Sequence, residues 1–233
     1  IVFALGYLAL YPGLGNSAGK LGWSSVGQYE AEVAKANQEL APLYAKFSGM
    51  PPEEVAKDPQ AMAIGDRLFM NNCAQCHGSD ARGTKGFPNL SDSDWLYGGT
   101  HDKIKETLVN GRIGNMPPMA AAVGSPEDVR NLAHYVLSLS KSPHDALRAS
   151  LGKPKFVACA ACHGPDGRGN QTIGAPNLAD DIWLHGWGEN AIIAMVNNGK
   201  VNQMPAQAGK LTDAQLHVLA SYVWSLSNQP AAK

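Results

Sequence analysis

The stretch CAQCHGSDARG covers residues 73–83, and a second stretch, CAACHGPDGRG, covers residues 159–169. Together they contain all four cysteines of this 233-residue chain. In each stretch two cysteines are separated by two residues and are followed at once by a histidine. A C-x-x-C pair can be a redox dithiol, part of a metal site or a haem attachment site, so the histidine decides the interpretation.

The sequence C-x-x-C-H is the attachment sequence for c-type haem, because two thiols bond to one porphyrin edge and the next residue ligates the iron. A thioredoxin-like dithiol needs a βαβ context, which this sequence does not predict, and a zinc site made of both pairs would leave the histidines and the repetition unexplained. The sequence therefore predicts two covalently attached haem c groups. The predicted attachment residues and proximal ligands are Cys73, Cys76 and His77, and Cys159, Cys162 and His163.

The similarity between the two stretches extends well beyond the cysteines. Cys159 follows Cys73 by 86 residues (159 − 73), and the PNL sequence at Pro176 follows the one at Pro88 by 88 (176 − 88). The YV pairs at residues 135–136 and 222–223 match at an offset of 87. Such a steady offset indicates a duplicated unit, and two copies are too few for a solenoid.

The sixth iron position determines whether a haem transfers electrons or binds a ligand. Among seven methionines only Met116 and Met204 occupy matching positions, and each is followed by proline. Met/His ligation raises the reduction potential and is typical of electron carriers. We therefore expect these two methionines to be iron ligands, with ordinary packing as the alternative; Met119 matches Gln207 and is interpreted as a packing residue.

Further residues in the repeats are candidates for holding the haem and its histidine. The far ring nitrogen of a ligating histidine usually bonds to a carbonyl or carboxylate, and the matched PNL turns offer the carbonyls of Pro88 and Pro176. Tryptophan and tyrosine can donate to haem propionates, although core packing is an equal alternative for the tryptophans. The candidate donors are Trp95, Trp183 and Tyr97, and the candidate cationic partners of the propionates are Arg82 and Arg168.

Helical patterns dominate the chain. The last segment of each unit shows apolar residues at helical spacing, after a cap at Ser125 and at Thr212, and no strand-like alternation is present. The sequence predicts an all-α fold. The predicted organisation is the end of a transmembrane helix at residues 1–15, a linker with an amphipathic helix at 16–57, and tandem cytochrome c-like domains at 58–141 and 142–233.

The first eleven residues, IVFALGYLALY, are uncharged. A full membrane span needs about 20 apolar residues, but tyrosines followed by PGLG are typical of the end of one at the membrane interface. We expect the outer half of a transmembrane helix that begins before this chain; the alternative is a buried N-terminal helix. Residues 26–47 predict a mostly exposed helix, interrupted or kinked at Pro42.

The charge pattern excludes one class of partner. The chain has 19 Lys and Arg against 20 Asp and Glu, and no run of basic residues. Nucleic-acid-binding proteins carry basic patches, so no nucleic acid is expected as a partner.

Each unit, from GDRLFMNNCAQCH through PNL and MPP to YVLSLS, resembles a class I cytochrome c domain. The resemblance implies that the first and last helices cross, with Gly65 and Phe69 meeting Tyr135 in the first unit. The second unit departs from this pattern, because Pro154 interrupts its first helix and Phe156 lies one position off.

The whole chain resembles the di-haem subunit III family (CcoP/FixP) of cbb3-type cytochrome c oxidases. This resemblance implies a non-catalytic electron-entry subunit in the bacterial inner membrane, with its haem domains facing the periplasm. Its expected partners are a cytochrome c donor and the mono-haem and catalytic subunits, of which the last reduces oxygen. In this family the axial methionine need not come from the haem's own unit, so the pairing of Met116 and Met204 stays open.

Two other functions are consistent with two haem motifs. One is a di-haem carrier for another respiratory complex or a dehydrogenase, and the apolar N-terminus favours the oxidase over it. The other is a peroxidase or gas sensor with one five-coordinate iron, against which the matched methionines argue. The histidines outside the motifs do not match between units and are interpreted as surface or interface residues; they are His101, His134, His144, His185 and His217.

Overall fold

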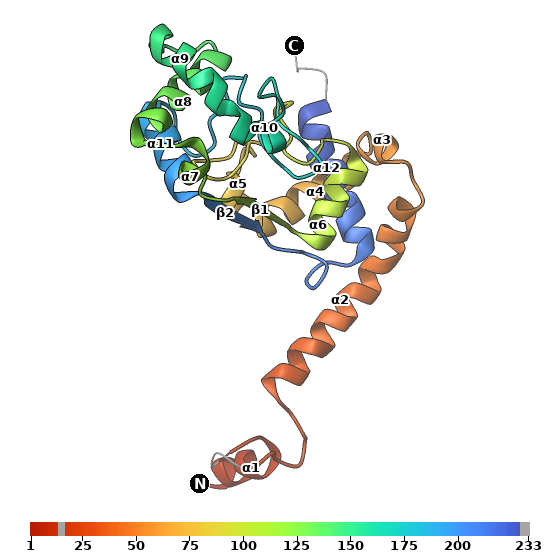
Figure 1. Cartoon of the computed structure of the whole chain (residues 1–233). Coiled ribbons are helices and arrows are strands. Elements are labelled where there is room, and N and C mark those ends of the chain that lie inside the picture. Colours follow the sequence, from red (N-terminus) through yellow and green to blue (C-terminus); the bar gives the residue numbers. More distant parts are fainter. Residues whose placement is uncertain (14–16, 229–233) are drawn as a thin grey trace. The chain divides into compact units, whose positions relative to one another are not determined.

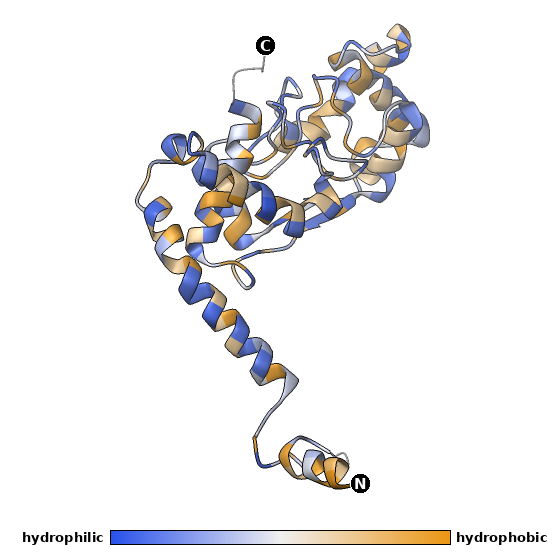
Figure 2. Ribbon diagram, turned by 180° about the vertical axis from the view of Figure 1, so that it is seen from behind, coloured by the Kyte–Doolittle hydropathy of each residue, from blue (hydrophilic) through white to orange (hydrophobic). Residues whose placement is uncertain are grey.

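The computed structural model describes residues 1–13 and 17–228, and the chain forms two compact units, residues 1–49 and 50–233. The first unit contains α1 (Val2–Leu10) and α2 (Ser25–Ser48) (Figure 1). The side chain of Ser24 caps α2, which runs without a break through Pro42 and shows hydrophilic residues along its length (Figure 2). The helix predicted at 26–47 is confirmed.

The predicted membrane segment forms only a short helix in the described part of the chain. None of the residues of α1 is buried. No helix within residues 1–13 and 17–228 is both long enough and apolar enough to cross a membrane. Residues 14 and 15, where the predicted segment ends, and 229–233, at the end of the second predicted domain, lie outside the described residues.

The second unit is mostly helical, as predicted. Side chains begin its main helices: Asp58 accepts hydrogen bonds from the N–H groups of Gln60 and Ala61, while Ser125 and Asp128 form a capping box. The elements in chain order are α3 (Pro52–Val55), α4 (Pro59–Asn72), α5 (Ala74–His77), α6 (His101–Asn110), β1 (Arg112–Met116), α7 (Ala120–Val123), α8 (Pro126–Leu139), α9 (Ala146–Gly152), η1 (Lys153–Phe156), α10 (Val157–His163), α11 (Glu189–Asn198), β2 (Lys200–Met204) and α12 (Asp213–Asn228).

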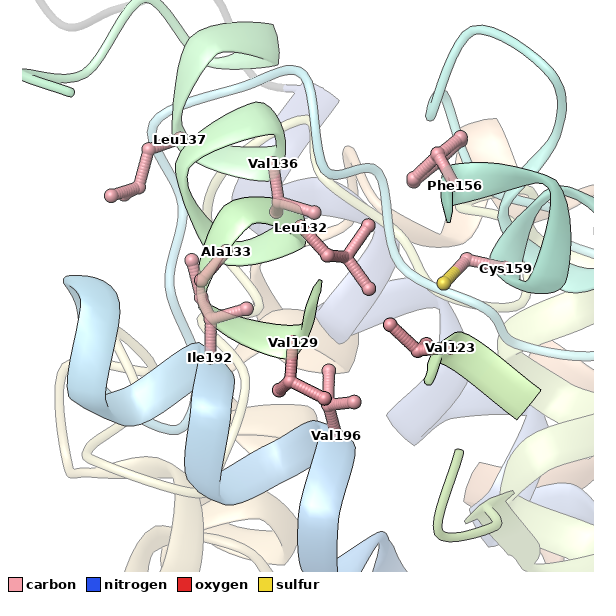
Figure 3. Close-up of a cluster of buried hydrophobic side chains, with 10 residues drawn as sticks. All are labelled: Val123, Val129, Leu132, Ala133, Val136, Leu137, Phe156, Cys159, Ile192 and Val196. Carbon is pink, nitrogen blue, oxygen red and sulfur yellow. The ribbon is translucent and has the colours of Figure 1, made fainter. Parts of the chain in front are cut away.

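Two hydrophobic clusters form the core of this unit, and each draws on both sequence repeats. The first-motif cluster joins α4, α6 and α12, and consists of Phe69, Cys73, Ala81, Ile104, Leu108, Leu216, Leu219, Ala220 and Val223. The second-motif cluster joins α7, α8, η1, α10 and α11, and consists of Val123, Val129, Leu132, Ala133, Val136, Leu137, Phe156, Cys159, Ile192 and Val196. Figure 3 shows Leu132 and Val123 pointing toward Cys159. The last helix of each repeat therefore packs beside the haem motif of the other, across the predicted boundary at residues 141–142.

A glycine marks the close crossing of α4 with α12. A Cβ atom at Gly65 would lie 2.5 Å from the Cβ of Tyr222, and the rings of Phe69 and Tyr222 have centroids 5.8 Å apart. The sequence interpretation placed Tyr135 at this crossing, and that was wrong. Tyr135 instead packs on Phe156, with centroids 5.3 Å apart. The two tyrosines occupy equivalent positions in the repeats, so their sequences do not distinguish the partners.

A two-stranded antiparallel ribbon connects the repeats, although the sequence predicted no strands. Strand β1 pairs with β2 in a register that places Arg112 opposite Met204 and Met116 opposite Lys200. Each strand has only five residues and pairs with the equivalent segment of the other repeat. Short strands whose partner is distant in sequence leave no clear alternation, which explains the wrong prediction.

Candidate haem-binding sites

The first motif sits where α4 ends and the single turn α5 follows. The N–H of Cys73 donates to Phe69 O at 2.7 Å, and the N–H of His77 donates to Cys73 O at 2.9 Å. Cys73 is buried and Cys76 is exposed. One helical turn therefore presents both thiols and the histidine from adjacent positions, as attachment to a single macrocycle edge requires.

The second motif repeats this geometry on α10. Cys159 is buried and Cys162 is exposed. The N–H of Gly169 donates to His163 O at 2.7 Å, as the N–H of Gly83 does to His77 O. Because the two motifs belong to different clusters, the cysteine pairs do not form one four-cysteine site.

Both motif histidines are fixed by a backbone carbonyl. Nδ1 of His77 lies 3.0 Å from Pro88 O, and Nδ1 of His163 lies 3.0 Å from Pro176 O. The structure thus contains the two hydrogen bonds that the PNL turns suggested. Burial lowers the pKa of each imidazole, and the hydrogen bond from Nδ1 raises it by less. A neutral ring that donates through Nδ1 keeps its lone pair on Nε2, the atom available to ligate iron.

The buried thiols are poorly suited to dithiol chemistry. Burial, with a smaller effect of Cys76, raises the pKa of Cys73 to about 11. Burial also raises the pKa of Cys159, again with a smaller effect of its neighbouring cysteine. Reactive dithiols have a lowered thiol pKa, so this environment favours attachment cysteines over a redox pair.

The candidate sixth ligands stand at the ends of the ribbon. Met204, at the end of β2, packs against the first-motif cluster, and the loop behind it docks on α6 through Gln207 N donating to Leu108 O at 2.8 Å. The loop behind β1 docks in the same way on α11, where Met119 N donates to Val196 O at 2.8 Å. Met119 packs against the second-motif cluster, as its interpretation as a packing residue predicted.

The family model for subunit III of cbb3-type cytochrome c oxidase matches residues 60–136 and 155–223, one segment for each motif. The chain belongs to this family. Membership in the subunit III family accounts for the two cytochrome c-type domains. It confirms the predicted haem c binding and the predicted electron-transfer role in a cbb3-type oxidase.

Curated relatives agree with this membership. The chain is 66% identical to the CcoP subunit of the cbb3-type oxidase of Rubrivivax gelatinosus, over 97% of this chain and 75% of that protein. It is 39% identical to FixP of Sinorhizobium medicae, over 97% of this chain and 84% of the relative. It is 40% identical to FixPc of Rhizobium leguminosarum, over 97% of this chain and 85% of the relative.

The subunit III core also contains buried polar atoms that fit a bound haem. The Tyr97 hydroxyl, Nη2 of Arg112 and Nε1 of Trp183 are buried and have no hydrogen-bond partner among the described residues. Buried donors normally have partners, so these three atoms indicate an acceptor that belongs to a bound group. Haem propionates are such acceptors. Trp95 packs against the first-motif cluster and Trp183 against the second.

The two arginines predicted to pair with the propionates lie on the surface, away from these buried atoms. Arg82 and Arg168 have exposed side chains, at 3.9 Å and 3.1 Å from the carboxylates of Asp80 and Asp166. They stay predictions as partners of a propionate. A half-buried cation of the subunit III fold is Arg112, whose Nη2 atom is buried, and sequence reasoning missed it. Its only sequence signal was its match to Lys200, and that match does not reveal burial.

Proposed function

We propose that the chain carries two covalently attached haem c groups and passes single electrons from a cytochrome c donor towards the mono-haem and catalytic subunits of a cbb3-type oxidase. The observation that carries this proposal is the duplicated geometry of His77 and His163, each buried and each held by a proline carbonyl at 3.0 Å. The haem supplies a one-electron iron couple when bound. The chain contributes attachment, ligation and shielding from water.

We also propose that the sixth ligands are exchanged between the repeats. Met204 packs against the cluster that contains Cys73, and its strand partner Arg112 directly follows the end of α6. By the same ribbon register, Met116 lies opposite Lys200, which follows the end of α11. Met204 is therefore assigned to the site of His77, and Met116 to the site of His163.

This exchange makes the two sites depend on one another. Each would need a motif from one repeat and a methionine and last helix from the other. Neither repeat alone supplies all the side chains of a closed site. A carrier benefits from such a construction because rigid packing keeps both iron ligands in place.

The first unit supports attachment to the bacterial inner membrane, with the haem domains on the periplasmic side. Tyr7 and Tyr11 stack with ring centroids 4.9 Å apart, and Tyr11 meets Trp23 at 6.0 Å. Aromatic residues beside an apolar segment are enriched at membrane interfaces. The periplasmic side is the one that the resemblance to the CcoP/FixP family implies.

The proposal is tested on the full chain by the pyridine haemochrome assay and by optical spectra before and after addition of carbon monoxide. We expect two haems per chain, both low-spin and neither binding carbon monoxide. Met116→Ala and Met204→Ala should each open one site to carbon monoxide. Met119→Ala is the matched control and should open none, since Met119 packs in the core. Rapid binding of carbon monoxide by the unaltered protein would contradict the proposal and favour a sensor or peroxidase.

A further inference from the structure

Arg112 and Tyr97 form a half-buried pair beside the first motif's site. The guanidinium carbon of Arg112 lies 4.6 Å from the centroid of the Tyr97 ring. On the other side, Nε of Arg112 donates to the Thr107 hydroxyl at 2.8 Å and Nη1 donates to Glu106 at 3.0 Å. The guanidinium is therefore held by α6 and by an aromatic face, and its orientation is fixed.

Two donors of this pair have no partner. Nη2 of Arg112 and the Tyr97 hydroxyl are buried and unpaired among the described residues. The Tyr97 ring packs directly on the backbone of Gly174, where an added Cβ atom would lie 2.5 Å from the hydroxyl, so no side chain at that position is available as a partner. A buried donor without a partner is destabilising, so two of them on one contacting pair of residues indicate a missing acceptor.

The local charge favours an anion as the acceptor. Glu106 is the carboxylate beside Arg112, and it also pairs with Lys103 at 2.7 Å. Its pKa lies below the usual value because of these two cations, Lys103 first. One carboxylate shared by two cations leaves a net positive charge, and Arg binds carboxylates through more than one N–H.

The pair lies on the side of the first motif. Arg112 is opposite Met204 in the ribbon, and Met204 and Trp95, two residues before Tyr97, both pack against the first-motif cluster. A carboxylate bound here would therefore belong to a group seated at His77.

The second repeat has no equivalent arginine–tyrosine pair. The residues that match Tyr97 and Arg112 at an offset of 88 are His185 and Lys200. Lys200 is exposed. Nε2 of His185 lies 2.9 Å from the amide of Asn202, so it has a partner, and burial keeps its pKa below the usual value. The two haem sites thus differ in one half-buried, permanently charged group.

We propose that Nη2 of Arg112 and the hydroxyl of Tyr97 bind a propionate carboxylate of the haem attached at Cys73 and Cys76, and that Arg112 gives this haem the higher reduction potential of the two. Reduction adds an electron to the site, and a fixed cation in a low-dielectric interior favours the more negative state. The inference rests on the proposed di-haem function. It implies that electrons collect on the haem of His77 after entering the chain.

The test is a spectroelectrochemical titration of the full chain, which should resolve two midpoint potentials. Arg112→Gln should lower the higher midpoint by an amount equal to about a tenfold change in the reduction equilibrium, or about 59 mV for one electron. Lys200→Gln is the matched control. It should change the reduction equilibrium of neither haem by more than about threefold, since exposed charges are screened. Met204→His should lower the same midpoint as Arg112→Gln, because methionine ligation raises the potential.

Two milder variants keep the test decisive if Arg112→Gln does not fold. Arg112→Lys retains the charge and should keep the order of the midpoints, while Tyr97→Phe removes one donor and should lower the higher midpoint slightly. Equal midpoints in the unaltered protein, an unshifted midpoint in both Arg112→Gln and Tyr97→Phe, or an equal shift in Lys200→Gln would overturn the inference. With two haems per chain, such a result leaves the proposed function standing; fewer than two haems would overturn both.

Discussion

The crossing of α4 and α12 gives a quantitative test of the exchange between repeats. In Gly65→Ala the new methyl would lie 2.5 Å from the Cβ and 2.9 Å from the Cγ of Tyr222. Carbon atoms pack at about 3.5–4.0 Å, so the helices must separate by about 1 Å. Overpacking of this kind costs about 1–3 kcal/mol, and the better helix propensity of alanine returns about 1 kcal/mol. We expect a net loss of about 0–2 kcal/mol.

A double-mutant cycle distinguishes the partner of Gly65. In a Tyr222→Gly background the added methyl has room, so Gly65→Ala should become neutral or stabilising, which gives a coupling of about 2 kcal/mol. In the matched Tyr135→Gly background the cost of Gly65→Ala should stay within about 0.5 kcal/mol of its original value. Guanidinium unfolding followed by far-UV circular dichroism measures all of these changes. Coupling to Tyr135 and none to Tyr222 would refute the exchanged packing.

Three further predictions concern pH and backbone. The backbone N–H of Ser125, and then Lys155, lower the pKa of Asp128 to about 2. The ionised Asp128 therefore stabilises the fold above its unfolded pKa of 3.8, and this stability is lost as the pH falls towards 2. In Asp128→Asn the free energy of unfolding should depend less on pH in this window. Burial, and then the hydrogen bond to Asp66, raise the pKa of Tyr222 to about 12. The protonated Tyr222 therefore stabilises the fold below pH 10.0, and this stability is lost between pH 10 and 12. Alkaline unfolding of Tyr222→Phe should not show this loss of stability. Gly169→Ala should destabilise the protein by about 3 kcal/mol in guanidinium unfolding, because φ is +82° and the new Cβ would lie 2.5 Å from Ala175 O; a change below about 1 kcal/mol would contradict this close approach.

Local signals in the sequence identified much of the structure. The C-x-x-C-H motifs and the caps at Ser125 and Thr212 act within a few residues, and the PNL turns bond to histidines 11 and 13 residues before them in the same segment. The structure shows the corresponding short-range bonds, such as Gln215 N to the Thr212 hydroxyl at 3.3 Å and Nδ1 of His77 to Pro88 O at 3.0 Å. Interactions of this range depend on residues that a single segment contains.

The exchange between repeats could not be predicted in the same way. The apolar faces of α8 and α12 are matched in sequence, so each is compatible with either motif. The choice depends on which helix fits beside Gly65, and on a ribbon formed by segments 88 residues apart. The role of Arg112 was not predicted for a related reason. Arg112 is partly covered by Tyr97, whose ring packs against Gly174 of the other repeat, and no local pattern around Arg112 reveals this contact.

In the proposed structure of the haem sites, methionines exchanged between the repeats complete the iron coordination. The most direct measurement is a nuclear Overhauser experiment on the fully reduced protein labelled with ¹³C-methyl methionine, with Met116→Leu and Met204→Leu variants to assign the ring-current-shifted methyl signals. We expect two such signals, with the Met204 methyl close to the side chains of Leu108 and Phe69 in the first-motif cluster. Contacts of the Met204 methyl with Val196 and Ile192, or the absence of any shifted methionine methyl, would contradict the exchange.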